Sequence, residues 1–528
     1  MTAMPHGGPM DFQAIILCGP GSSLSTFTSR PEEFPKCLIQ VANRPMVFYA
    51  IDFCRRSGIA DITLITPPVS YAPLRAALDQ NPYLTSFYSL SVSVVAPKDL
   101  EMTICINTNF LLLPCNIICE IPGESILEAW MATRCVISDS NNSRGARHPS
   151  PPAKSYFNRQ LEARSGGLAV YYQTDNREES IQEEVTDLVA IAPLEHDEAP
   201  IVPPLKGPLV PRFNLSKLFM SMPMDTIKEK IKQDKGLLIR HSLIQNCPRI
   251  RILTTFRDAH VYVFPYWVKD LLHYQSRLES VSEDLVGIWA KSGWQKGLGN
   301  KLGLTMDFNK DTAEQDYSSP KTSPTGAFVD KVIDLRGMST TRTRLSPEMQ
   351  PESLFQSAAT ELPHILAYVH RGSAPFIRRV DNTGVLVSTS LFLAKLPSIE
   401  EVGWKAASPL AHAHKVAYPE GVASPSNITK KDCLLCENVI VESAAVIKES
   451  VIGANCQIGS SARIVRCVLM EGVVIESRAQ LTGCVIGQRV QIGRESVLKG
   501  CEVQDANVIP KETNTRDEKF MVSETLCI

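Results

Sequence analysis

A regular spacing of aliphatic residues near the C-terminus constrains the fold of this chain more than any other feature. The gaps between successive positions repeat the order six, six, five and end on a six. The positions are Leu435, Val441, Ile447, Ile452, Ile458, Ile464, Leu469, Ile475, Leu481, Ile486, Ile492, Leu498, Val503 and Ile509. A hexapeptide period of this kind is typical of a parallel β-helix, in which each coil has three short strands that each point one aliphatic residue inward. One coil cannot bury its own apolar side, so neighbouring coils must stack.

Cysteines follow the same repeat. Cys467, Cys484 and Cys501 are spaced by seventeen residues, and Cys433 falls on this spacing two steps earlier. We predict a column of small buried thiols, because the sequence lacks four ligands at the Cys-x-x-Cys type of spacing that a structural zinc site uses. The alternative is an antiparallel sheet with a fortuitous period, but strict alternation alone does not produce a five-residue step.

Composition and charge narrow the class of protein. The chain has 528 residues, enough for roughly two or three domains. Its formal net charge of −2 gives no sign of general affinity for nucleic acid or anionic membrane. Residues 1–10 lack the cationic and apolar segments of a signal peptide, and no apolar run is long enough to cross a bilayer. With fifteen cysteines lying mostly in apolar runs, we expect free thiols in the reducing cytosol of the cytoplasm.

The N-terminal part alternates strand-like and helix-like segments, which predicts an α/β domain with a mostly parallel sheet and helices on both faces. We expect strands at residues 12–18, 62–66, 92–96, 110–114, 168–172, 188–192 and 260–264, and helices at 45–57 and 124–133. We predict an N-terminal tail at 1–10, an α/β domain at 11–294, a flexible linker at 295–360, a connecting segment at 361–432, the β-helix at 433–510 and a C-terminal tail at 511–528.

Three short motifs near the N-terminus come in a fixed order. The run Gly19 to Leu24 is a glycine-rich turn, and the runs Phe34 to Leu38 and Val41 to Met46 follow it. A glycine-rich turn after the first strand of an α/β sheet can cradle phosphates with backbone N–H groups. The order resembles the sugar-phosphate nucleotidyltransferase superfamily. The resemblance implies a Rossmann-like nucleotidyltransferase domain, often followed by a left-handed β-helix, with an arginine and a lysine on the substrate phosphates and an aspartate on the metal.

Carried over residue by residue, this resemblance argues against catalysis. Leu24 stands where the arginine is expected and offers no bidentate fork to an anion. Pro20 replaces a glycine and removes an N–H donor, and Asn116 stands where the metal aspartate is expected. The run from Lys98 to Thr103 lacks the family's Gly-Thr-Ala element. We therefore predict no catalytic residue, no metal and no cofactor.

What remains of the predicted site is a vestigial phosphate-binding loop made by Gly19, Gly21 and Lys36. Lys36 does match the family motif. It is either a relic phosphate ligand or a solvated surface lysine, and the missing partners favour the second interpretation.

A second set of segments sharpens the resemblance. The runs Leu237 to Arg240, Pro248 to Ile252 and Asp258 to Phe264, with Asp11 to Ala14 and Leu391 to Ser398, resemble the family of gamma subunits of eukaryotic translation initiation factor 2B. We predict a structural role for His260 in its strand. The resemblance implies a complex with epsilon, alpha, beta and delta subunits that exchanges GDP for GTP on initiation factor 2. In that family the exchange chemistry lies in a helical domain of epsilon, which gamma supports.

We therefore expect a non-catalytic subunit of the exchange complex, in keeping with the nineteen mostly polar residues after Ile509, which are too few for a helical domain. The first alternative is an active sugar-1-phosphate nucleotidyltransferase, which needs the anion-binding arginine and the metal carboxylate. A hexapeptide acyltransferase generally needs a histidine base in the β-helix, and no histidine follows His414. A scaffold unrelated to translation is the remaining alternative.

Overall fold

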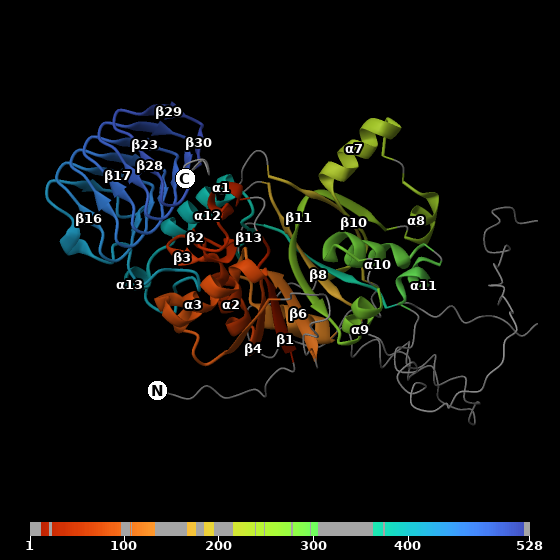
Figure 1. Cartoon of the computed structure of the whole chain (residues 1–528). Helices are drawn as coiled ribbons and strands as arrows, with labels where there is room; N and C mark the ends of the chain where they lie inside the picture. The colour runs from red at the N-terminus through yellow and green to blue at the C-terminus, as the bar shows by residue number, and fades with distance from the viewer. Residues whose placement is uncertain are drawn as a thin grey trace, which may run out of the picture.

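A computed structural model of the chain describes residues 12–20, 24–96, 106, 108–132, 166–175, 184–194, 215–237, 239–247, 249–275, 278–295, 297–304, 363–372 and 375–521. Figure 1 shows a solenoid, in blue, beside an α/β domain built from the earlier part of the chain. The predicted fold class, a Rossmann-like α/β domain followed by a left-handed parallel β-helix, is confirmed.

The α/β domain is organised around one nine-stranded sheet in the order β5-β4-β1-β6-β11-β8-β12-β10-β9. The strands are β1 (Phe12–Leu17), β4 (Asp61–Ile65), β5 (Ser91–Val95), β6 (Asn109–Pro114), β8 (Leu168–Gln173), β9 (Asp187–Pro193), β10 (Leu215–Pro223), β11 (Arg251–Phe264) and β12 (Leu366–His370). The first four strands in this order are parallel, but β11 runs antiparallel to β6 and β8, and β10 runs antiparallel to β12 and β9. β8 pairs parallel with β12, so β10 and β11 are the reversed strands of this described sheet. The prediction of a mostly parallel sheet is confirmed, with these two strands as the exceptions.

Helices cover both faces of the sheet, as predicted. One apolar core lies under α2 (Met46–Arg56), α3 (Tyr71–Gln80), α4 (Pro82–Thr85) and the helical residues 123–132. The other lies under α9 (Trp267–Tyr274), a π-helix (Val281–Val286), α10 (Gly287–Ser292) and α11 (Leu298–Leu302). Alternate residues of β1 pack into the two cores, with Ala14 on one side of the sheet and Ile15 on the other, as the two-residue period of a strand requires. None of the helices in the described ranges combines the length and apolar content that a membrane span needs.

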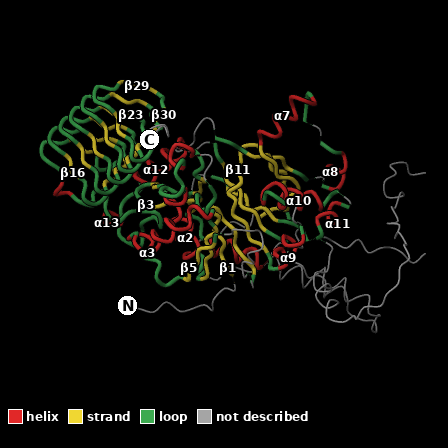
Figure 2. Tube along the Cα trace, viewed as in Figure 1, coloured by secondary structure: helices red, strands yellow, loops and turns green. Residues whose placement is uncertain are grey.

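The solenoid has three sheets of short parallel strands, each paired with the strand one coil later, and Figure 2 shows these strands separated by short loops. The β14 face contains β14 (Asn427–Ile428), β17 (Val446–Lys448), β20 (Arg463–Val465), β23 (Gln480–Thr482), β26 (Val497–Lys499) and β29 (Asn514–Arg516). The β15 face contains β15 (Leu434–Leu435), β18 (Val451–Ile452), β21 (Val468–Leu469), β24 (Val485–Ile486), β27 (Glu502–Val503) and β30 (Lys519–Phe520). The β16 face contains β16 (Ile440–Val441), β19 (Gln457–Ile458), β22 (Val474–Ile475), β25 (Gln491–Ile492) and β28 (Val508–Ile509).

The aliphatic positions found in the sequence all lie in the solenoid interior, each buried to 2% exposure or less. Cys433, Cys467, Cys484 and Cys501 are completely buried, and Ser450 occupies the remaining position in that column. The predicted column of buried thiols is therefore confirmed, and the Cys467 sulfur accepts the Cys484 backbone N–H at 3.5 Å.

Coil geometry extends beyond the aliphatic repeat at both ends. Val416 and Val422 pair with Leu435 and Val441, and Ile428 pairs with Ile447. Each of these pairs is nineteen residues apart instead of seventeen, which hides this coil from a search for the strict period. At the other end Thr515 and Phe520 continue the six-five spacing, but Thr515 is polar. The solenoid strands thus run from Asn427 to Phe520, beyond the residues 433–510 expected from the repeat.

Two glycines at solenoid corners allow a prediction in which one substitution is the control for the other. Gly483 has φ +66°, and an added Cβ would approach only the Gly500 nitrogen, at 4.0 Å. Gly453→Ala would instead place the Cβ 2.6 Å from the Met470 carbonyl carbon in the next coil. We expect Gly483→Ala to cost about 1 kcal/mol of unfolding free energy through its backbone conformation alone. Gly453→Ala should cost at least about 3 kcal/mol, because two coils must move apart. Urea unfolding of the two variants measures the difference, and equal costs would contradict this packing.

Candidate functional site

The transferase-like motifs lie where the α/β domain meets the solenoid. The run Val41 to Met46 forms a tight hairpin of β2 (Gln40–Val41) and β3 (Arg44–Pro45), followed at once by α2. Ala42 and Asn43 at its tip have φ +46° and +65°, the left-handed conformations that two-residue hairpin turns of type I′ require. The turn places Asn43 at the tip of the hairpin and Arg44 at the start of β3.

The hairpin tip is joined to the solenoid, and to the segment that precedes it, by hydrogen bonds from side chains to backbone carbonyls. The Asn43 Nδ2 atom donates to the Ile452 carbonyl in the solenoid at 2.8 Å. Arg44 donates to the Leu410 and Ala411 carbonyls at 3.0 and 2.9 Å, and its guanidinium lies 5.0 Å from the centre of the Phe48 ring. All of these groups are buried or nearly so, so losing one donor would leave a carbonyl without its partner, at a cost of about 1–3 kcal/mol.

One face of the solenoid is buried against the α/β domain. On the β15 face the outward side chains are aliphatic in the first four strands, and each is 2% exposed or less; they are Leu434, Val451, Val468 and Val485. They share one apolar cluster, here called the seam, with Leu24 and Phe27 and with residues of α12 (Thr383–Lys395). Figure 1 shows α12 lying between the two parts of the chain. Leu24, which stands where an arginine is expected, is 1% exposed and contributes to this seam.

Polar contacts continue the seam at the last coils. The Thr26 hydroxyl of α1 (Ser25–Thr28) donates to Glu502 at 2.6 Å, and the Gln504 amide donates to the Ser29 hydroxyl at 2.6 Å. A cavity of about 60 Å³ lies beside them, lined by residues 33–35 and by Asp505 among others. Burial raises the pKa of the Asp505 carboxyl to about 6. The segment after the glycine-rich turn is therefore fastened to the solenoid.

The three residues of the predicted phosphate-binding loop have different placements. Gly19 is exposed just after β1, Gly21 lies outside the described residues, and Lys36 is half-buried in the short helix Lys36–Leu38. A hydrogen bond with the Cys18 thiol lowers the pKa of Cys115; burial opposes this shift, and the nearby Lys36 charge adds to it. Hydrogen bonds with the Cys115 and Cys37 thiols, together with burial, raise the pKa of Cys18 well above its ordinary value. Lys36 thus lies beside a group of buried thiols.

Asn116, at the position expected for the metal aspartate, is 3% exposed. Its Nδ2 atom donates to the Val380 carbonyl at 2.8 Å, and the Val380 N–H donates back to the Asn116 carbonyl at 2.8 Å. This pair of hydrogen bonds ties the turn after β6 to the segment that follows β13 (Ile377–Arg379). Among the described residues, no group of three or more His, Cys, Asp and Glu side chains is arranged to hold a metal ion. The predicted run from Lys98 to Thr103 lies outside the described residues.

A buried ionic network lies where β11, β13 and the segment before β9 meet. Glu184 accepts from Arg378 at 2.6 Å and from Arg257 at 3.4 Å, and Arg257 also donates to Asp381. Arg379 lies 3.6 Å from Asp381 and donates to the Asp258 carbonyl at 3.1 Å. These guanidinium groups are already paired with carboxylates, as buried charges must be. The network therefore joins β11 and β13 to the segment before β9 and offers no vacant anion site.

Asp258 and His260 occupy a bulge of β11, where the pairing with β8 shifts between Asp258 and Tyr262. The Asp258 carboxylate accepts the His260 N–H at 2.8 Å and the Tyr262 hydroxyl at 2.6 Å. Burial, reinforced by the nearby Asp187 carboxylate, raises the pKa of Asp258 to about 7. Burial and the charges of Arg379, Arg257 and Lys36 lower the pKa of His260 well below its ordinary value, which suits the structural role predicted for it.

Asp258→Asn should flatten the dependence of stability on pH. The carboxyl has an ordinary pKa of 3.8 and a folded value of about 7, so the folded state holds the proton that the unfolded chain releases between these values. The stabilisation of the folded state by this bound proton is complete below pH 4 and is lost as pH rises through about 7. Between pH 5 and 8 we expect the free energy of unfolding of the variant to rise by about 2–4 kcal/mol relative to the native chain. Thermal melting across this range measures the effect, with exposed Asp234→Asn as the control; parallel profiles would contradict the assignment.

Sequence reasoning identified Leu24, Lys36 and Asn116 but missed the residues that join the two parts. Asn43 and Arg44 stood inside a motif interpreted for its family resemblance, and the partners of Asn43 and Arg44 lie more than 360 residues away. A usable signal was present in the solenoid. The first four strands of the β15 face begin with a second aliphatic residue, as in Val451-Ile452 and Val468-Leu469, and two adjacent aliphatic residues in a strand predict burial on both faces.

Comparisons with known proteins agree with this architecture. Residues 429–527 match the family model described as the GMPPB C-terminal domain. Over 302 residues the chain is 23% identical to a protein of Schizosaccharomyces pombe (strain 972 / ATCC 24843) named translation initiation factor eIF2B subunit gamma. The match covers 54% of this chain and 53% of that protein, so the chain spans about half the length of the curated relative that it matches. The resemblance to gamma subunits of translation initiation factor 2B, predicted from the sequence, is confirmed.

Proposed function

We propose that this chain is a non-catalytic subunit of a cytosolic complex that exchanges GDP for GTP on translation initiation factor 2. In this proposal it pairs with an epsilon subunit, which carries the exchange chemistry, and assembles with alpha, beta and delta subunits. The similarity to a gamma subunit of initiation factor eIF2B supports the assignment to translation initiation. Neither nucleic acid nor membrane is bound directly, in keeping with the net charge of −2.

One observation carries the proposal that the chain is not itself an enzyme. The two positions at which transferase chemistry needs charged groups are occupied by Leu24 and Asn116, and both side chains are used to hold the protein together. Leu24 is buried in the seam with the solenoid, and Asn116 donates to the Val380 carbonyl. An anion or a metal at either position would have to displace these contacts. The structure is therefore suited to support a partner that performs the chemistry.

A nucleotide-release assay tests the proposal. The chain would be purified alone and together with an epsilon-type subunit, and the rate of GDP release from initiation factor 2 would be measured for each preparation. We expect no acceleration by the chain alone and faster release by the pair than by epsilon alone. Failure of the two subunits to associate, or exchange activity in the isolated chain, would overturn the proposal.

The runner-up is a sugar-1-phosphate nucleotidyltransferase, which the match to the GMPPB C-terminal domain favours. That match lies in the solenoid, whereas the phosphate and metal positions lie in the α/β domain. Release of pyrophosphate from GTP or ATP in the presence of sugar 1-phosphates and Mg²⁺ distinguishes the two functions. The proposed function expects no release above that of a heat-denatured sample.

A further inference from the structure

Helix α7 (Met224–Asp234) extends away from the rest of the chain, as Figure 1 shows. Of its eleven residues only Ile227 is buried, and residues 228–235 are all exposed. A helix of this length is only marginally stable in isolation, and most helical stability in proteins comes from packing of an apolar face. The distal half of α7 therefore lacks the packing that usually stabilises such a helix.

Exposed apolar side chains lie on this helix and on the segments that follow it. Ile231 lies one turn beyond the buried Ile227, on the same side of α7, and is 38% exposed. Four further aliphatic residues, Leu237, Ile239, Ile244 and Ile252, are 37% to 52% exposed on the loop after α7, on α8 (His241–Asn246) and at the start of β11. Residues 224–237, 239–247 and 249–252 are here called the α7–α8 lobe. Single exposed aliphatic residues are ordinary, but several within one short stretch of the chain are typical of an interaction site.

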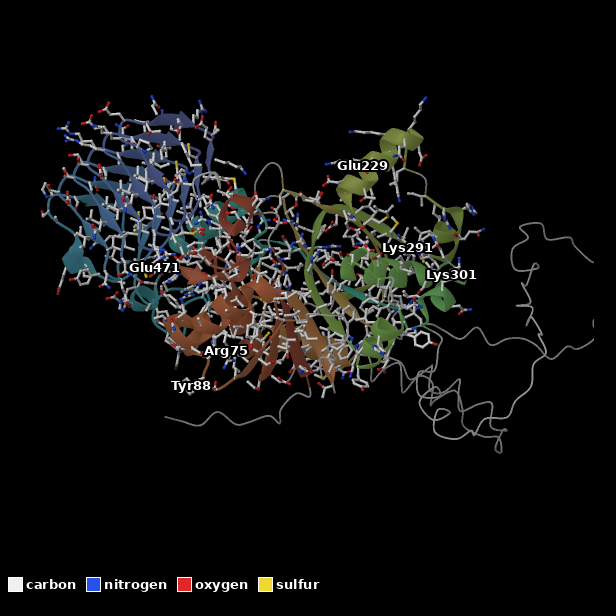
Figure 3. All side chains as sticks on the ribbon, in the orientation of Figure 1. Arg75, Tyr88, Glu229, Lys291, Lys301 and Glu471 are labelled. Carbon is white, nitrogen blue, oxygen red and sulfur yellow. The ribbon has the colours of Figure 1, made fainter. Side chains whose placement is uncertain are left out.

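The α7–α8 lobe is also strongly basic. It carries seven lysines and arginines against three carboxylates, a net charge of +4 in a chain whose total is −2. The cations are Lys228, Lys230, Lys232, Lys235, Arg240, Arg249 and Arg251. Burial, and next the positive charges of Lys230 and Arg240, lower the pKa of Lys291 on the adjacent helix α10. Figure 3 labels Lys291 on α10 below α7, where Glu229 is labelled. Cations from three elements are thus crowded together, and carboxylates from a partner would relieve their repulsion.

The composition of the lobe distinguishes between classes of partner. The sequence from 224 to 252 contains no Phe, Tyr or Trp, although single-stranded nucleic acid sites use aromatic platforms and membrane-interface helices use aromatic anchors. Asp225, Glu229 and Asp234 interrupt the cations along α7 and would repel a uniformly anionic phosphate surface. Mixed charges around exposed aliphatic residues suit a protein surface instead.

We propose that the α7–α8 lobe is a docking surface for a protein partner that presents carboxylates around an apolar patch. In this proposal the exposed aliphatic side chains of the lobe contact the partner's apolar patch, and the lysines and arginines of the lobe pair with its carboxylates. The inference about this surface is independent of the proposed function, because it rests on the exposure and charge of the lobe residues alone. None of these residues contributes to the seam.

Binding of a defined peptide to the full-length chain tests this surface. The probe is a fluorescent sixteen-residue helical peptide of alternating Leu pairs and Glu pairs, measured by fluorescence anisotropy. We expect the triple variant Lys228→Glu, Lys230→Glu and Lys232→Glu to bind at least tenfold more weakly than the native chain. The double variant Ile231→Asp and Ile244→Asp should lose a similar factor and should do so at high salt as well. These side chains are exposed, so thermal melting should be unchanged in both variants.

A matched control separates docking from general electrostatic attraction. Lys405→Glu, Lys430→Glu and Lys511→Glu change the net charge equally at scattered exposed positions, and we expect less than a twofold effect on peptide binding. Equal losses in the control and lobe variants would overturn the proposal. So would lobe-dependent binding of a polyuridine RNA or of phosphatidylserine vesicles in place of the peptide. Dimerisation of the native chain that the lobe variants abolish would also overturn it, by assigning the surface to a second copy.

Discussion

Ile492→Asp will unfold the solenoid, and Ile475→Asp will do the same. Both side chains lie in the interior column of the β16 face, at 0% and 2% exposure, among aliphatic residues of neighbouring coils. A carboxylate placed there loses its hydration and gains no partner, and the aliphatic contacts are lost as well. We expect a cost on the order of 5 kcal/mol, measured as a lost or strongly lowered thermal transition.

The same strand supplies the control. Gln491 precedes Ile492 in β25 and is exposed on the outside of the coil, so Gln491→Asp should change the melting temperature little. Since the two positions differ by one residue, an effect that depends on side-chain direction must separate them. Equal loss of stability in the two variants, or unchanged stability in Ile492→Asp, would contradict the assigned register.

Leu24→Arg will not restore transferase activity, although it returns the side chain that the family resemblance expects. The metal position would still carry Asn116, whose amide donates to the Val380 carbonyl. Leu24 is 1% exposed in the seam, where a guanidinium would be buried without a carboxylate partner. We expect a loss of about 3 kcal/mol or more and a loosened contact between the α/β domain and the solenoid. Limited proteolysis and a pyrophosphate-release assay measure the two effects.

Leu24→Met is the control for this substitution, because it keeps an apolar side chain of similar volume and should cost less than about 1.5 kcal/mol. Sustained turnover of a sugar 1-phosphate by the Leu24→Arg variant would refute both the prediction and the proposed non-catalytic role. A fully stable Leu24→Arg variant would show instead that the seam does not depend on this position.

The solenoid was predictable because its interior columns repeat along the sequence. Each inward position must be aliphatic for its coil to stack, so the spacing records the fold directly. The two ends of the solenoid were not predicted, because the aliphatic spacing breaks down there. Thr515 continues the spacing with a polar side chain, and the coil containing Val416 has two additional residues. In the α/β domain most strands were predicted, but β10, β12 and the direction of β11 were not. Strand direction has no local signature, since the two-residue period is the same either way.

The residues of the candidate site also differ in whether the sequence alone predicts their roles. Leu24 and Asn116 were informative from the sequence, because a substitution at a motif position changes the chemistry that the position can perform. Asn43, Arg44 and Asp258 were not, because their roles depend on partners brought near by folding. Asn43 lies 409 residues from the carbonyl that it reaches. Such long-range contacts leave no pattern at either position in a single sequence.

The hydrogen bond between Thr26 and Glu502 spans 476 residues of chain. A ribosome adding roughly 5–20 residues per second needs on the order of half a minute to a minute and a half to synthesise the chain between these two residues. During that interval Leu24 and Phe27 have been made, but the coils that bury them have not. The nascent chain therefore carries an uncovered apolar surface through most of its synthesis, and its yield in the cell will depend on how well chaperones shield that surface until the last coil emerges.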